Sequence, residues 1–245
     1  FKVSPTNQEI LHNVHVLNDF VIGSYYSDGV AIFDASDPTN VIPVGYYDTQ
    51  PTSTRTENGV WGAWGFYKSG VISLSDMKMG LYVVKPTYVR GARIQGIVTD
   101  TNTTQVLSNV KISFVDTAIS ANSNIDGLYK TGSAKAGLTN FKAEKAGYIT
   151  KFFRATLING TTLNVDIQLR QIPVYTTQNA SFCEGSNFIL PDGRRVSAPG
   201  IYISNLISPT GRDSIITVNL SKKNNSVKVI SASFCQGYTY TLPKG

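Results

Sequence analysis

The feature that most limits how this chain can fold is a repeat in its last third. The pattern Ala-Ser-Phe-Cys-x-Gly occupies residues 180–185 and returns at 232–237, and Leu-Pro-x-Gly occupies 190–193 and returns at 242–245. Both pairs are offset by 52 residues, and chance does not keep so many positions in one register. The range 178–245 therefore holds one β-rich repeat and the beginning of a second.

The composition of the 245-residue chain favours strands. It contains 13 Tyr and 11 Phe, and Thr, Ser, Val, Ile, Asn and Gly recur throughout. These residues suit half-buried strands and the turns between them, and stretches rich in Ala, Leu and Glu are missing. We therefore expect an all-β chain, long enough for one to three domains.

Charge and metal-binding residues exclude several classes of function. The net charge is +6, but Lys and Arg are scattered rather than gathered on one segment, so we expect no nucleic-acid partner. No run of 18 apolar residues occurs, so this segment has no membrane span. Two cysteines and two histidines do not supply the four closely spaced ligands of a structural zinc site, and we expect no cofactor.

The first segment, residues 1–86, contains two similar stretches. Each is a turn with a glycine followed by a short apolar strand, at residues 27–34 and 79–85. Each also follows another strand-like run, at residues 19–26 and 70–75. Strands that recur at this period are typical of β-propeller blades, which stack because one four-stranded sheet cannot bury both of its faces.

Several motifs in this segment occur in the order found in one family. The motifs are His12-Asn13-Val14-His15-Val16, Ser24 to Val30, Asp34 to Pro38, Val44 to Thr49, Gly62-Ala63-Trp64-Gly65, and Ser75-Asp76-Met77 with Gly80 to Val84. With these motifs the segment resembles the LVIVD-repeat propellers of the choice-of-anchor B family. The resemblance implies the last blades of a truncated propeller, and two blades cannot close a ring.

The second segment, residues 93–170, reads as a β-sandwich. Residues 94–100, 110–115 and 162–169 alternate apolar and polar side chains, and Asp126-Gly127 marks a hairpin turn. With Gly96-x-Val98-Thr99-Asp100 and Lys145-Ala146-Gly147-Tyr148, the segment resembles the carboxypeptidase regulatory-like domain. That resemblance implies a transthyretin-like, non-catalytic module. Linkers are expected near residues 85–92 and 171–177.

The third segment resembles the C-terminal repeats of large secreted proteins of the Bacteroidetes. Their pattern includes Gly-x-Tyr and Gly-Cys-Asp-Ser-Ile, which residues 200–202 and 211–215 follow, except that Arg212 replaces the second cysteine. The resemblance implies an extracellular or outer-surface location reached by type IX secretion. The chain starts at Phe1 and stops within a repeat, so we expect a fragment of a longer protein.

Titratable residues give weak candidates for chemistry. His12 and His15 are three positions apart, and in an extended strand their side chains point to opposite faces, so a shared metal is not expected. Several aspartates lie beside Gly, Pro or Ser, where they form turns through side-chain hydrogen bonds; calcium binding at propeller turns is the alternative. These aspartates are Asp28, Asp34, Asp37, Asp48 and Asp76.

An aromatic cluster is the main candidate for binding. Trp61, Trp64, Phe66 and Tyr67 lie beside several glycines, and together with His12 they could contact a sugar or a protein if exposed. Burial in a blade core is the commoner fate of such residues. Cys183 and Cys235 form a disulfide either with each other or each within its own repeat.

No catalytic motif is present. The chain lacks the Gly-x-Ser-x-Gly elbow and the glycine-rich phosphate loops. The leading hypothesis is a non-enzymatic secreted or cell-surface protein for adhesion, display or protein interaction. The alternatives are a carbohydrate-binding surface protein and an accessory region of a secreted hydrolase.

Overall fold

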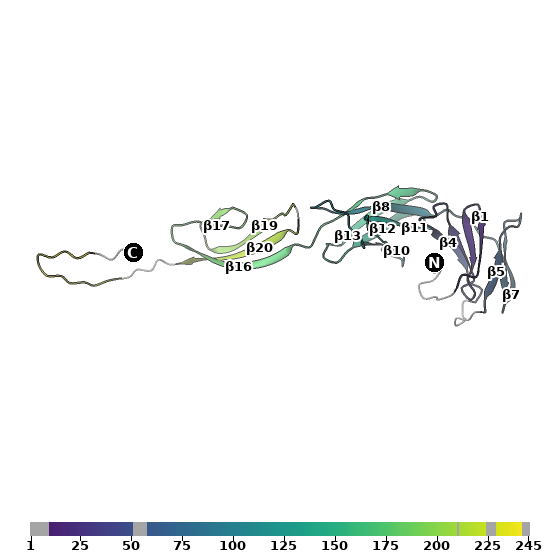
Figure 1. The fold of residues 1–245 in the computed structure, drawn as a ribbon, viewed down its shortest axis with the longest axis horizontal. Coiled ribbons are helices and arrows are strands. Elements are labelled where there is room, and N and C mark those ends of the chain that lie inside the picture. The colour runs from purple at the N-terminus through teal and green to yellow at the C-terminus, as the bar shows by residue number, and fades with distance from the viewer. Residues whose placement is uncertain (1–9, 51–57, 210, 224–228, 242–245) are drawn as a thin grey trace. The chain divides into compact units, whose positions relative to one another are not determined.

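A computed structural model describes residues 10–50, 58–209, 211–223 and 229–241 (Figure 1). Their regular elements are strands, which confirms the predicted all-β class, and no helix in these ranges is long and apolar enough to cross a membrane. The chain divides into two compact units. Unit 1 is Phe1–Ile172 with Pro209–Gly211, and unit 2 is Pro173–Ser208 with Arg212–Gly245.

Unit 1 begins with two antiparallel sheets. Strands β1 (Asn13–Leu17), β2 (Phe20–Ser24), β3 (Val30–Asp34) and β4 (Ile42–Tyr47) form a four-stranded meander. Strands β5 (Val60–Trp64), β6 (Ile72–Asp76) and β7 (Gly80–Val84) form a three-stranded one. Apolar side chains of both sheets share one core. It contains Phe20, Ile22, Val30, Ile32, Val60, Ala63, Ile72 and Leu74.

The two glycines predicted to form turns in this region have backbone angles that favour glycine. Gly29 directly precedes β3 and Gly80 begins β7, and their φ angles are 78° and 86°, a left-handed conformation that favours glycine. A four-stranded meander is the expected shape of a propeller blade. The described strands do not close a ring, so the propeller itself stays a prediction.

The second half of unit 1 has two sheets in the predicted segment 93–170. One has the order β10 (Ser120–Asn122), β9 (Lys111–Phe114), β12 (Gly137–Glu144), β13 (Lys151–Leu157). The other has β8 (Ala92–Asp100) between β11 (Leu128–Ser133) and β14 (Thr162–Asn164), and β15 (Ile167–Leu169) also pairs with β8. Residues of both sheets form a single core, which includes Ile94, Ile112, Tyr129, Phe141 and Ile167.

The run 162–169, predicted as one strand, is interrupted. It forms β14 and β15, and the two residues between them take other partners. The carboxylate of Asp166 accepts a hydrogen bond from the backbone N–H of Ile97 (2.8 Å). The carbonyl of Val165 accepts one from the buried Tyr129 hydroxyl (2.7 Å). A side chain therefore replaces a backbone acceptor at this point of the ladder.

Unit 2 contains one small sheet covered on one face. Strand β20 (Ser214–Lys223) lies between β16 (Val174–Cys183), which is parallel to it, and β19 (Gly200–Leu206), which is antiparallel. Side chains near the hairpin of β17 (Phe188–Ile189) and β18 (Arg195–Val196) pack on this sheet. The core residues are Phe182, Leu190, Val218 and Leu220. Residues 229–241, from the second repeat, form no strand and are exposed.

Candidate functional site

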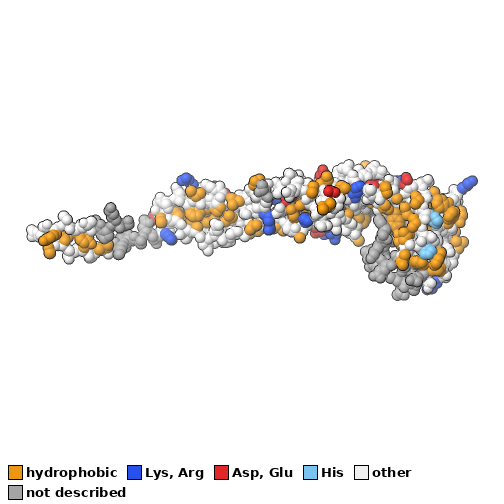
Figure 2. All heavy atoms as spheres, in the orientation of Figure 1, with side chains coloured by type: hydrophobic (Ala, Val, Ile, Leu, Met, Phe, Trp, Pro, Cys, Tyr) orange, Lys and Arg blue, Asp and Glu red, His pale blue; other side chains and the backbone are white. Residues whose placement is uncertain are grey.

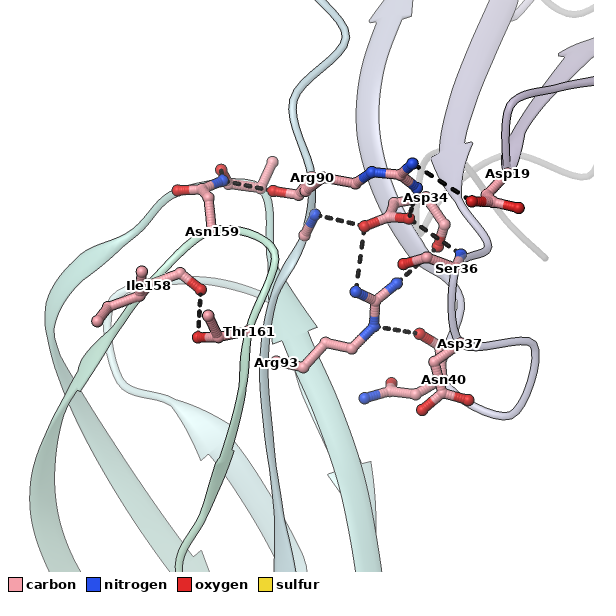
Figure 3. A network of polar contacts seen from close by, with 12 residues as sticks. Asp19, Asp34, Ser36, Asp37, Asn40, Arg90, Arg93, Ile158, Asn159 and Thr161 are labelled. Atoms are coloured by element: carbon pink, nitrogen blue, oxygen red, sulfur yellow. Dashed lines mark hydrogen bonds and ion pairs between the residues drawn. The ribbon is translucent and has the colours of Figure 1, made fainter.

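The most elaborate polar site of unit 1 is built on Asp34, at the end of β3 (Figure 3). Its side chain is completely buried. One carboxylate oxygen accepts hydrogen bonds from Arg90 Nη1 (3.0 Å) and from the backbone N–H of Ser36 (3.0 Å). The other lies 3.1 Å from Arg93 Nη1 and 2.7 Å from the backbone nitrogen of Gly91. We call Asp34, Arg90, Gly91 and Arg93 the Asp34 junction.

Four donors surround the Asp34 carboxylate, so its charge is well compensated. Burial by itself would raise the pKa of Asp34, but the hydrogen bonds from Ser36, Arg93 and Gly91 outweigh it, and the pKa lies far below its usual value. Arg93 is itself only 3% exposed. Asp34 and Arg93 therefore form a buried ion pair, and losing one partner leaves the charge of the other buried without its main compensation.

The two arginines also reach backbone carbonyls of the first sheet. Arg93 donates to the carbonyl oxygens of Asn40 (3.1 Å) and of Asp34 itself (3.1 Å). Arg90 donates to the carbonyl of Asn18 (3.2 Å), pairs with Asp19 (3.3 Å) and lies over the ring of Phe20, 4.5 Å from its centroid. These contacts attach residues 90–93 to the β1–β4 sheet.

The second half of unit 1 also forms hydrogen bonds to residues 90–93. The side-chain nitrogen of Asn159 donates to the carbonyls of Arg90 and Ala134, and the backbone N–H of Gly160 donates to the carbonyl of Gly91 (2.9 Å). A Cβ at Gly91 would lie 2.8 Å from Cβ of Ile42, so only glycine fits there without a shift. The segment 85–92, predicted as a linker, therefore ends in a fixed junction between the two halves of unit 1.

The other aspartates of the first segment form turns, as predicted. Asp37 accepts from the N–H of Thr39 (2.9 Å), and Asp48 accepts from the N–H of Gln50 (2.7 Å). The carboxylate of Asp76 accepts more hydrogen bonds than those of Asp37 and Asp48. It accepts from the N–H groups of Lys78 (2.9 Å) and Met79 (2.8 Å) and from the side chains of Thr49 (2.6 Å) and Gln50 (3.1 Å).

These turns leave little for calcium to bind. The oxygens of Asp34 and Asp76 are already occupied by several protein donors each. In the described ranges, no group of three or more His, Cys, Asp or Glu side chains is placed to hold a metal ion. Turn formation and the Asp34 junction therefore account for Asp34, Asp37, Asp48 and Asp76.

The aromatic cluster lies on the surface. Trp61 and Trp64 are 48% and 47% exposed, and Phe66 and Tyr67 are similar, so the expectation of burial in a blade core is wrong. Val60 and Ala63 of β5 face the core instead, which turns both tryptophans outward. Figure 2 shows orange hydrophobic side chains and the pale blue histidines together where Figure 1 labels β1 and β5.

Both histidines lie against this cluster, not on opposite sides of the chain as predicted. His12 precedes β1, and its ring is 4.0 Å from the ring of Trp61. The ring of His15 is 5.3 Å from that of Trp64. The ladder between β5 and β6 is irregular at Trp61, and the Trp61 carbonyl contacts His12 Nδ1 (2.8 Å) and accepts from Asn13 Nδ2 (2.8 Å). His12 thus helps to attach β5 to β1.

The cysteines show no pairing. Cys183 and Cys235 are both exposed and free in the structure, and their disulfide pairing stays a prediction. A binding role for His12, Trp61, Trp64 and Tyr67 also stays a prediction.

Sequence reasoning missed the Asp34 junction. It assigned Asp34 to a turn, which the bond from Ser36 confirms, but gave no role to Arg90 and Arg93. The arginines are 56 and 59 residues from Asp34, a separation that local pattern cannot bridge. The available hint was two arginines around Gly91-Ala92, in a chain with only 16% charged residues.

No protein-family model matches the chain, and no curated protein does. Among solved structures, the minor pilin GBS52 of Streptococcus agalactiae aligns at 14% identity over 45% of this chain and 64% of that one (TM-score 0.30). A type II cohesin–X-dockerin complex of Acetivibrio cellulolyticus aligns at 20% identity over 32% and 57% (TM-score 0.26). A streptococcal ancillary pilin aligns at 13% identity over 88% and 80% (TM-score 0.29).

The chain thus spans less than two thirds of the length of the first two structures. At these TM-scores the likeness carries neither a family nor a function to this chain.

Proposed function

We propose that the chain belongs to a non-enzymatic secreted or cell-surface protein, in which unit 1 serves as a stiff spacer for adhesion, display or protein interaction. The Asp34 junction carries this proposal. The buried Asp34 carboxylate has one donor from the first sheet and three from residues 90–93, and it resists bending between the two halves of unit 1 because a hinge motion there would separate these buried charges.

One further observation supports a spacer. The aspartates of the turns accept hydrogen bonds from backbone N–H groups, an arrangement that suits a scaffold better than proton transfer. That the two halves of unit 1 are propeller blades and a regulatory-like sandwich is part of the proposal and rests on the sequence resemblance. The extracellular location and the type IX route belong to the same proposal and rest on the resemblance of the repeats alone.

The stiffness can be measured with two spin labels in unit 1. Cysteines at the exposed positions Val16 and Ile125 carry the labels, in a chain with Cys183→Ser and Cys235→Ser. We expect one narrow distance distribution, which Asp34→Ala broadens. Asp19→Ala is the matched control, because it removes only the outer ion pair of Arg90. A broad distribution in the parent chain would refute the spacer.

A second candidate function is carbohydrate binding, favoured by the exposed tryptophans. Trp61 and Trp64 offer ring faces at a surface that also holds His12 and Tyr67. Binding on a glycan array should then be lost with Trp64→Ala. Tyr46→Ala, a more exposed aromatic on β4, is the control and should leave it unchanged. A parent chain that binds no glycan removes this candidate.

A further inference from the structure

Unit 1 contains an apolar groove of about 390 Å³ that the roles described above do not use. The groove is lined by residues of β3 and β4 and by residues of the segment 84–89, which begins at the end of β7. Val30 and Ile32 line it although they are only 2% and 7% exposed, so the groove reaches the core that the first two sheets share. Val44, Val84 and Pro86 are further apolar lining residues.

A glycine within β4 leaves this space open. Gly45 lines the groove and pairs with Ile32. Its φ angle is not positive, so neither its own backbone nor the register shift beside it requires glycine. A Cβ at Gly45 would lie 3.9 Å from Cβ of Ile32, an ordinary contact, so packing does not exclude a side chain. Glycine inside a strand often marks the close approach of a ligand, and we call this space the Gly45 groove.

One cation complements the apolar lining. Among the described residues that line the Gly45 groove, Lys85 alone is charged. Lys85 is exposed, and within the described part of the chain it forms no ion pair. An apolar site with a single positive charge suits an alkyl chain that ends in a carboxylate. Burial of the chain supplies affinity, and the charge fixes its orientation.

We propose that the Gly45 groove binds one medium-chain fatty acid, with its alkyl chain against Val30, Ile32 and Val84 and its carboxylate at Lys85. Sites for small ligands measure about 300–1,000 Å³. The Gly45 groove lies near the lower end of that range, which suits a single short chain rather than a lipid with two chains. Each buried methylene should therefore strengthen binding about fourfold until the groove is full.

The test is isothermal titration calorimetry of the whole chain with hexanoate, octanoate and decanoate below their micelle concentrations. We expect one molecule bound per chain, with affinity rising about fifteenfold for each two methylenes. Decanol is the probe without a charge. Lys85→Gln should weaken the binding of decanoate about fivefold and leave that of decanol unchanged. Lys78→Gln, in the exposed turn before β7, is the matched control and should change neither.

Two variants that fill the groove test where the ligand lies. Gly45→Leu fills it from β4 and Thr87→Phe from the segment 84–89, so each should abolish the binding of decanoate and of decanol. Val14→Leu, which enlarges an exposed side chain on β1 of the same sheet, is the control and should leave binding unchanged.

The tryptophan transition in urea shows whether each filled chain is folded, and if one is not, the other decides. A parent chain that binds no decanoate overturns the proposal, as does a folded, filled chain that binds like the parent. If Lys85→Gln leaves the binding of decanoate unchanged, the occupant is an uncharged apolar group, such as a side chain of a partner protein, and the fatty acid is excluded.

Discussion

The two segments predicted as linkers differ in what they connect. Residues 90–93, at the end of the first, are bonded to both halves of unit 1 through the Asp34 junction. At the second, the N–H of Ile172 donates to Gly147 of unit 1, and that of Val174 donates to Asp213 of unit 2, so the chain passes from one unit to the other between Ile172 and Pro173. A linker-like composition therefore does not by itself predict a hinge. Whether such a segment is held in place depends on its hydrogen bonds to residues far away in the sequence.

The largest effect is expected from Asp34→Ala. Removing the carboxylate leaves Arg93 buried without its partner, which costs about 3–5 kcal/mol in the free energy of unfolding. Both tryptophans lie in the first half of unit 1, so their fluorescence reports on it during urea unfolding. In the parent chain this transition should coincide with that of the sandwich, and in the variant the two should separate.

Asp19→Ala is the control for that experiment. It removes only a partly exposed pair with Arg90, worth no more than about 1 kcal/mol. If Asp34→Ala lowers the free energy of unfolding no more than this control does, the Asp34 junction does not fix the first linker.

A smaller effect, confined to one unit, is expected from Val218→Ala. Val218 is fully buried in the core of unit 2, and the truncation should lower the stability of that unit by about 2 kcal/mol. If Pro173 separates two folding units, the tryptophan transition should stay where it is, while the far-ultraviolet circular dichroism of unit 2 melts earlier. A matching shift of the tryptophan signal would contradict the division.

Acid should weaken unit 1 through Asp100. Burial would raise the pKa of Asp100, but hydrogen bonds from Gln171 and from the N–H groups of Thr103 and Asn102 lower that pKa to about 2. A carboxylate with a depressed folded pKa contributes stability above its unfolded pKa of about 4, and this is lost as the pH falls toward 2.

The expected loss from this group is about 2 kcal/mol. Asp100→Asn should be less stable than the parent at neutral pH and should show a shallower loss between pH values of about 4 and 2. Urea unfolding at several pH values measures both slopes. Equal slopes for the two chains would assign the acid sensitivity to other carboxylates, such as Asp34.

The contrast between the linkers also shows what sequence can reveal. Alternation and turn residues were enough for the all-β class, for the turns of Gly29 and Gly80, and for the turn-forming role of Asp37 and Asp48. They could not show that the tryptophans point outward, because that depends on which side of β5 faces the core. They could not show the Asp34 junction either, because its partners meet only after two sheets have formed.

The smallest effect is expected from lengthening the second linker. Two residues inserted between Ile172 and Pro173 should change the stability of either unit by less than about 0.5 kcal/mol, because the bonds of Ile172 and Val174 on either side each stay within one unit and added loop length costs little. The same insertion between Val89 and Arg90 should move the tryptophan transition by several times as much, since it displaces Arg90 and Gly91 from Asp34. Equal shifts for the two insertions would mean that the Asp34 junction adapts to a displaced backbone, and the contrast between the two linkers would then disappear.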